Sequence, residues 1–98
     1  MGVSESGKRI ESLCDALLRV SNRKEMLNFL EDLCTPVELR SLADRWQVAQ
    51  LLDKGVPYRS IHDRTGVSTA TVSRVARALS YGKKGYEQAL LHSKEFDK

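Results

Sequence analysis

The stretch Gly66–Val75 carries side chains suited to contacting DNA. Gly66 supplies a backbone position that turns freely, and Ser68 is placed to cap a helix by accepting a hydrogen bond from the amide of Thr71 or its neighbour. Short hydroxyl side chains and arginines follow at positions that face outward. Such side chains contact phosphates and base edges in a major groove. The spacing therefore predicts the turn and second helix of a DNA-reading helix-turn-helix.

The residues expected to bind DNA are polar or small and lie in or beside this motif: Arg59, Ser68, Thr69, Ala70, Thr71, Ser73, Arg74, Arg77, Lys83 and Lys84. The hydroxyl groups at positions 68, 71 and 73 are expected to meet phosphates, and positions 69, 70 and 74 to face the groove. The remaining basic side chains are expected to hold the DNA backbone. Phosphate contacts position a protein on the duplex, whereas base contacts specify the sequence.

An apolar face should hold the second motif helix on the helix before it, and its members are Val67, Val72, Val75 and Leu79. The preceding helix is expected over Pro57–Thr65, with Ile61 as its core residue. His62 is interpreted as a half-buried histidine that packs between helices rather than as a catalytic residue or a metal ligand. The alternative to a DNA-reading motif is an ordinary αα-corner whose polar side chains face water.

The charge of the chain is concentrated on the same segment. The net charge is +3 overall, but residues 54–84 hold seven basic residues and one acidic residue, a local net charge of +6. Residues 1–53 carry −2 and residues 85–98 carry −1. A basic patch on the motif would neutralise phosphates and make DNA binding depend on salt.

Helical patterns extend over the rest of the chain, and no strand pattern is sustained. Helices are expected from about Ser6 to Val20 and from Asn22 to about Leu33. A third should begin at a Thr35 cap, with Pro36 first and Glu38 closing a capping box, and should end at Gly55. The apolar residues expected along this third helix are Leu39, Leu42, Ala43, Trp46, Ala49 and those around Leu52. A short connector leads to a last helix over about 86–94, with Tyr86, Ala89 and Leu90 as its apolar residues.

The expected organisation is a single all-α domain over residues 1–98. Dimerisation helices should occupy about 6–54, the helix-turn-helix about 57–80 and the C-terminal helix about 86–94. The first two helices carry more apolar surface than a small motif requires, including Leu13, Leu17, Phe29, Leu30 and Leu33. This surface is interpreted as a dimer interface; the alternative is that it forms the core of one chain.

Several classes of protein are disfavoured by the sequence. There is no apolar run near the ~20 residues that span a bilayer, and residues 1–11 are too polar for a signal peptide. Cys14 and Cys34 lie among leucines and fit a reduced, cytoplasmic protein better than a disulfide scaffold. His62 and His92 lack metal-ligand spacing. No carboxylate pair, nucleophile–histidine arrangement or nucleotide-binding loop indicates an enzyme.

Two resemblances to known families sharpen these expectations. The string Gly66-Val67-Ser68-x-x-Thr71-Val72-Ser73-Arg74 resembles the reading unit of lac-type repressors. From about Met26 to Leu91 the chain resembles the Trp repressor family, and within it the short proteins labelled YerC/YecD. That likeness rests on Cys34-Thr35-Pro36-x-Glu38-Leu39-Arg40-x-Leu42-x-x-Arg45, followed by the motif helices at the same spacing. It implies a six-helix, intertwined homodimer that binds a pseudo-palindromic operator in double-stranded DNA.

The same resemblance implies an amino-acid corepressor bound between the reading helix and the dimer core. Thr35, Arg45 and Arg74 match positions that surround this ligand in the family. However, Val75 and Ala78 stand where the Trp repressor has a glycine and a ligand-binding serine, so tryptophan is not expected to bind. Histidine is the first candidate for a different effector, and no other cofactor is expected. Arg74 could serve either the ligand or DNA, and Arg45 could instead pair with the carboxylates near Asp44 or Glu38.

The sequence thus favours a cytoplasmic transcriptional regulator, most simply a repressor, that binds DNA as a homodimer. The alternative is a helical module that binds another protein and has no affinity for duplex DNA. Binding that is insensitive to salt would distinguish this module from the regulator.

Overall fold

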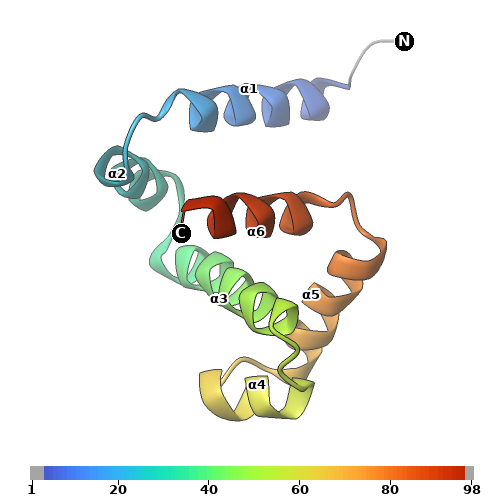
Figure 1. The fold of residues 1–98 in the computed structure, drawn as a ribbon. Coiled ribbons are helices and arrows are strands. Elements are labelled where there is room, and N and C mark those ends of the chain that lie inside the picture. The colour runs from blue at the N-terminus through green and yellow to red at the C-terminus, as the bar shows by residue number, and fades with distance from the viewer. Residues whose placement is uncertain (1–3, 97–98) are drawn as a thin grey trace. The chain divides into compact units, whose positions relative to one another are not determined.

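The computed structural model describes the backbone of residues 4–96 and the side chains of residues 4–94. Within these residues the fold consists of six helices and no strand (Figure 1). The chain divides into two compact units, the first ending at Leu39 and the second beginning at Arg40. The prediction of an all-α, six-helix fold is therefore confirmed.

The first unit contains α1 (Glu5–Arg19) and α2 (Arg23–Leu33), and side-chain caps begin both helices. The Ser4 hydroxyl accepts a hydrogen bond from the Gly7 amide at 3.0 Å, and the Asn22 side chain accepts one from the Glu25 amide at 2.9 Å. A capping residue lies just outside its helix. The second helix therefore starts one residue after Asn22, whereas α1 starts one residue before the predicted Ser6.

Neither α1 nor α2 buries a single residue. Leu18 is 83% exposed, Ile10 61% and Leu33 49%. The predicted apolar faces are present, but they do not form a core within one chain. The dimer interface on these helices stays a prediction, as does the alternative that they form the core of one chain.

The third helix, α3 (Pro36–Asp53), begins at the predicted capping box. The Thr35 amide donates to Oε1 of Glu38 at 2.8 Å, and the Glu38 amide donates to the Thr35 hydroxyl at 3.1 Å. Hydrogen bonds from the Thr35 amide and then from its hydroxyl lower the pKa of the exposed Glu38 carboxyl. Past the helix, Gly55 adopts a left-handed φ of 80°.

The core of the second unit joins α3, α4 (Tyr58–Thr65) and α5 (Thr69–Tyr81). Its buried members are Val48, Ala49, Ile61, Val67, Val72 and Val75. On α3 the predicted apolar set is partly wrong, because Leu42 and Ala43 are exposed while Val48, which was not predicted, is fully buried. Apolar residues occur around the whole circumference of α3, so their spacing does not fix which side faces α4 and α5.

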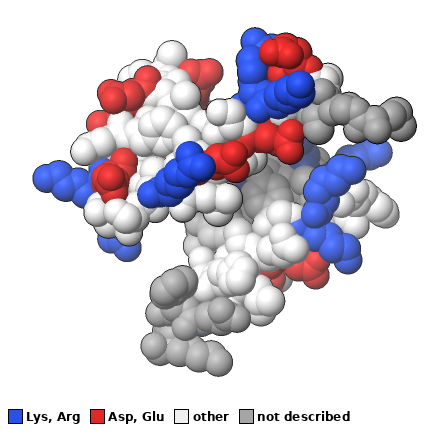
Figure 2. All heavy atoms as spheres, turned by 90° about the horizontal axis from the view of Figure 1, so that it is seen from above, with Lys and Arg blue, Asp and Glu red and all other residues white. Residues whose placement is uncertain are grey.

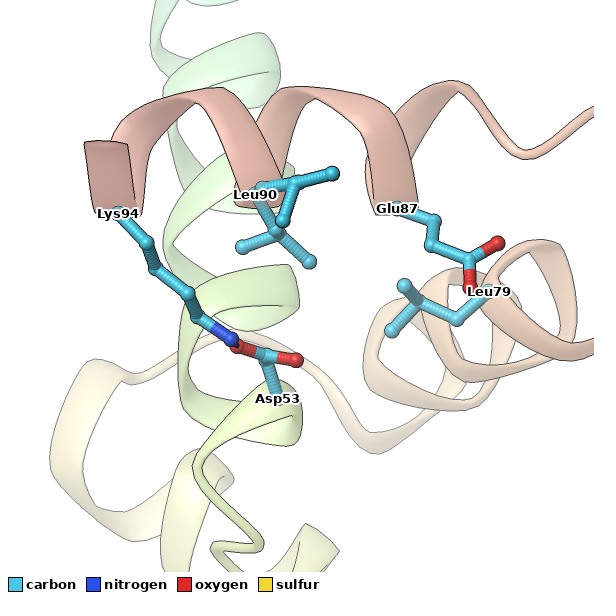
Figure 3. Close-up of a pocket in the computed structure, with 6 residues that line it drawn as sticks. Asp53, Leu79, Glu87, Leu90 and Lys94 are labelled. Carbon is cyan, nitrogen blue, oxygen red and sulfur yellow. Dashed lines mark ion pairs between the residues drawn. The ribbon is translucent and has the colours of Figure 1, made fainter. Parts of the chain in front are cut away.

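The last helix, α6 (Gly85–Phe96), packs against α5. Leu90 is buried as predicted, whereas Ala89 is exposed. Lys94 Nζ lies 2.8 Å from Oδ2 of Asp53 at the end of α3, and Figure 3 shows this pair beside a hollow that Leu79 and Leu90 also line. An ion pair as exposed as this one contributes at most about 1 kcal/mol, so burial of Leu90 contributes more to holding α6 in place.

Candidate nucleic-acid interface

The turn between α4 and α5 is held by an unusually complete set of hydrogen bonds. Gly66 has a left-handed φ of 77°, and its amide donates to the carbonyl of His62 at 2.8 Å. The Thr65 hydroxyl donates to the Ile61 carbonyl at 2.7 Å and accepts from the Val67 amide at 3.1 Å. Nδ1 of the His62 ring lies 2.7 Å from the Val67 carbonyl oxygen. Side chains at the end of α4 thus bind both polar groups of the Val67 backbone.

His62 therefore differs from its predicted role. Its side chain is exposed rather than half-buried, and it bonds to the turn instead of packing between helices. Thr65 and His62 are the two residues of this site whose function the sequence did not reveal. A threonine directly before the left-handed glycine is a weak signal for the first. For His62 the bond spans five residues across that glycine, so helical spacing gives no sign of it.

The amino terminus of α5 is capped as predicted. The Ser68 hydroxyl accepts a hydrogen bond from the Thr71 amide at 3.1 Å and donates to the Thr71 hydroxyl oxygen at 3.0 Å. A serine hydroxyl has one proton, so Ser68 uses it within the protein. The Thr71 hydroxyl keeps its own proton for an outside acceptor, although the residue is half-buried rather than fully outward.

The remainder of α5 has two distinct faces. Val72, Val75 and Ala76 are buried against the core. The residues predicted to face DNA from this helix lie on the other side, and all of the following are exposed: Thr69, Ala70, Ser73, Arg74 and Arg77. Because the core side holds the helix in place, the outward side chains can enter a groove without disturbing the packing.

The basic side chains around the motif are exposed and carry no ion pairs with described residues. This holds for Arg59 on α4 and for Lys83 and Lys84 in the connector after α5. Lys84 has a φ of 67°, and Gly82 lies so close to the Ala78 carbonyl that a Cβ would collide with it. Figure 2 shows a face on which Lys and Arg are interspersed with Asp and Glu. The excess of basic residues is a property of the segment 54–84 of the sequence.

Of the residues predicted to surround an effector, Arg45 and Arg74 lie in the second unit and Thr35 lies in the first. Arg45 on α3 is half-buried and Arg74 on α5 is exposed, and neither makes an ion pair with a described residue. The Glu38 carboxylate, the alternative partner predicted for Arg45, accepts a hydrogen bond from the Thr35 amide. The Thr35 hydroxyl is itself occupied by the capping box.

The two substituted positions lie in different surroundings. Val75 is 1% exposed and belongs to the core, so its side chain fills the space that a smaller residue would leave open. Ala78 lines a shallow, mainly apolar hollow of about 440 Å³ together with Trp46 and Tyr86. Ala78 offers no side-chain acceptor to a ligand's ammonium group. The expectation that tryptophan binds poorly stays a prediction.

Sequence similarity to known proteins assigns the chain to a family. The sequence profile described as "Trp repressor protein" matches residues 8–94. The chain belongs to the Trp repressor family. This is a family of DNA-binding regulators rather than enzymes, and the match extends further toward the N-terminus than the resemblance that begins near Met26.

Individual relatives within the Trp repressor family are similar over nearly their whole length. The chain is 45% identical over 89 residues to the uncharacterized protein YerC of Bacillus subtilis strain 168, covering 91% of this chain and 86% of YerC. A Staphylococcus aureus crystal structure described as that of a candidate Trp repressor has a TM-score of 0.85 at 41% identity, covering 90% and 88% of the two chains. A TrpR-like protein from Eubacterium eligens has a TM-score of 0.84 at 39% identity, covering 89% and 90%.

Within residues 4–96 no helix is long and apolar enough to cross a membrane. No group of three or more His, Cys, Asp or Glu side chains in that part of the chain could hold a metal ion.

Proposed function

We propose that this protein is a transcriptional repressor that acts in the cytoplasm and binds a pseudo-palindromic operator as a homodimer. The observation that carries the proposal is the construction of α5, which buries Val72 and Val75 and exposes hydroxyl and arginine side chains opposite them. A dimer would place two such helices in successive major grooves, about one helical turn apart.

Each exposed group has a role that follows from its chemistry. Arg74 and Thr69 are best placed for base edges, because they extend from the outward side of α5. The Thr71 hydroxyl and the guanidinium of Arg77 are suited to phosphates. Arg59, Lys83 and Lys84 lie on either side of α5 in the sequence and would neutralise phosphates beside the groove.

Dependence on salt tests the DNA-binding part of the proposal. If each subunit neutralises about four phosphates, a plot of the logarithm of the association constant against the logarithm of the salt concentration should have a slope of roughly −7. Arg77→Ala should weaken binding to all duplexes and flatten the slope. Arg19→Ala removes the same charge from α1, outside the motif, and should leave the slope unchanged. A slope near zero would favour the protein-binding module instead.

The homodimer is supported by the apolar surface of the first unit. Ile10, Leu13, Leu18, Leu27 and Leu33 are each at least 36% exposed, and α1 and α2 bury nothing. Apolar surface on this scale usually marks an association site. We expect sedimentation to show a dimer that persists at micromolar concentration. A stably folded monomer at that concentration would contradict the proposal.

An effector, if one acts, is proposed to be an amino acid other than tryptophan, with histidine as the first candidate. Arg45 and Arg74 keep unpaired guanidinium groups that could bind a carboxylate. Calorimetric titration with histidine, followed by DNA binding with and without it, tests this part. DNA affinity that no amino acid alters would show that the protein binds its operator without an effector.

A further inference from the structure

The His62 side chain is not among the residues proposed above to contact DNA. It is exposed, it belongs to the last turn of α4, and its Nδ1 atom lies 2.7 Å from the carbonyl oxygen of Val67. Val67 directly precedes Ser68, the residue that caps α5. The imidazole is therefore fixed beside the amino terminus of the helix proposed to enter the groove.

The bond to Val67 determines which ring nitrogen carries the proton. A carbonyl oxygen can only accept a hydrogen bond, so Nδ1 must be the donor. In the neutral ring the other nitrogen, Nε2, is then an acceptor without a hydrogen. Neutral His62 consequently has nothing to donate to a phosphate from its outer edge. Protonation adds a hydrogen at Nε2 and a positive charge, while the bond from Nδ1 to Val67 remains.

The charged and titratable groups near the ring form no ion pair with it; they include Tyr58 on α4. Charged residues on neighbouring elements are Arg59, Asp63 and Arg64 on α4, Asp53 and Lys54 at the end of α3, and Arg74 and Arg77 on α5. None of them forms an ion pair with His62, and residues 69–73 of α5 are uncharged. No described carboxylate is paired with the ring, so its outer edge is available to a phosphate.

We propose that His62 is a phosphate-binding residue that acts only in its protonated form, so that the affinity for DNA rises as the pH falls. The proposal rests on the DNA-binding function inferred above. The inward nitrogen preserves the turn in both protonation states, and the outward nitrogen changes from acceptor to charged donor. Histidine is the side chain that makes this change between about pH 8 and about pH 5.

The test measures the affinity for a mixed-sequence duplex of about 30 base pairs, long enough for two half-sites, at constant ionic strength. A phosphate contact does not depend on base sequence, so the operator need not be known. A charge-assisted hydrogen bond gained in each subunit should tighten binding about tenfold per subunit, or about 100-fold per dimer, between about pH 8 and about pH 6.

Three variants separate the two ring nitrogens and the charge. His62→Asn keeps an N–H donor at the Nδ1 position but has no Nε2. It should melt at the wild-type temperature, bind DNA like the wild type at about pH 8 and fail to tighten at about pH 6. His62→Lys carries a permanent charge, so its affinity should be equal at the two pH values. His92→Asn makes the same change at the chain's only other histidine and should leave the wild-type pH dependence intact.

The outcomes distinguish this proposal from the proposed function. Wild-type protein that binds the duplex equally well at both pH values overturns the role of His62 and leaves DNA binding standing. A His62→Asn variant that tightens as much as the wild type overturns it too. Protein that binds no duplex at either pH overturns the DNA-binding function and, with it, this inference.

Discussion

Replacing Thr65 with valine should weaken the helix-turn-helix without changing its shape. Valine has nearly the same volume and branching as threonine but lacks the hydroxyl. In the structure that hydroxyl accepts from the Val67 amide at 3.1 Å and donates to the Ile61 carbonyl at 2.7 Å. Both bonds are partly buried, and Val67 itself is only 8% exposed. Thr65→Val therefore leaves the Val67 amide without its partner in a place that water reaches poorly.

The size of the effect follows from this loss. Leaving a buried donor unsatisfied costs about 1–3 kcal/mol. For a domain of this length each kcal/mol lowers the melting temperature by about 4–8 °C, so the variant should melt roughly 4–24 °C below the wild type. DNA affinity should fall as well, because the turn sets the angle between α4 and α5.

Thermal unfolding followed by circular dichroism checks the prediction, with all proteins at equal concentration because a dimer's stability depends on concentration. Thr69→Val is the matched control. It makes the same chemical change four residues later, at an exposed side chain that bonds to no described residue, and should shift stability by less than about 0.5 kcal/mol. If Thr65→Val is no more destabilising than Thr69→Val, the hydroxyl does not secure the turn.

Three further predictions concern caps, backbone and effector. The pKa of Glu38 is lowered in the folded state. The contribution of the Glu38 carboxylate to stability is therefore present above its ordinary pKa of 4.5 and is lost as the pH falls through the lowered pKa. Glu38→Gln should flatten this part of an acid-unfolding curve measured by circular dichroism. At Gly66 an added Cβ would meet nothing within 4 Å, so Gly66→Ala should cost only the left-handed backbone term of about 1–2 kcal/mol in urea unfolding, and Gly66→Asn should cost less. Overpacking by Val75 and the hydrogen bond lost at Ala78 should cost about 1–3 kcal/mol each, and together they should weaken tryptophan binding by roughly 30- to 20,000-fold. A low-micromolar dissociation constant in calorimetry, with tighter DNA binding, would refute this.

The parts of the fold that sequence predicts well are those decided by near neighbours. The caps at Ser68 and at Thr35 with Glu38 depend on residues three apart, and both formed as expected. The left-handed turn at Gly66 is equally local. These signals fixed the helix boundaries to within about a residue or two and placed the helix-turn-helix correctly.

The parts that sequence predicts poorly depend on which helices meet. Val48 is buried and Leu42 exposed because the partners of α3 lie toward its carboxyl-terminal half, and no spacing along α3 reveals this. The bond of His62 to Val67 requires the turn at Gly66 to bring the ring back over the chain. The DNA contacts and effector residues stay predictions, since their partners are other molecules.

The two-sided construction of α5 has a consequence for how proteins of this kind diverge. The residues that fix the helix, Val72, Val75 and Ala76, are separate from those that face outward. The turn before the helix is secured from α4, by Thr65 and His62. Changing the exposed positions other than the Ser68 cap therefore leaves these contacts intact. Substitutions at a few exposed positions can therefore change which operator the protein binds during evolution. The same positions can be randomised to retarget the protein by engineering while the scaffold is unchanged.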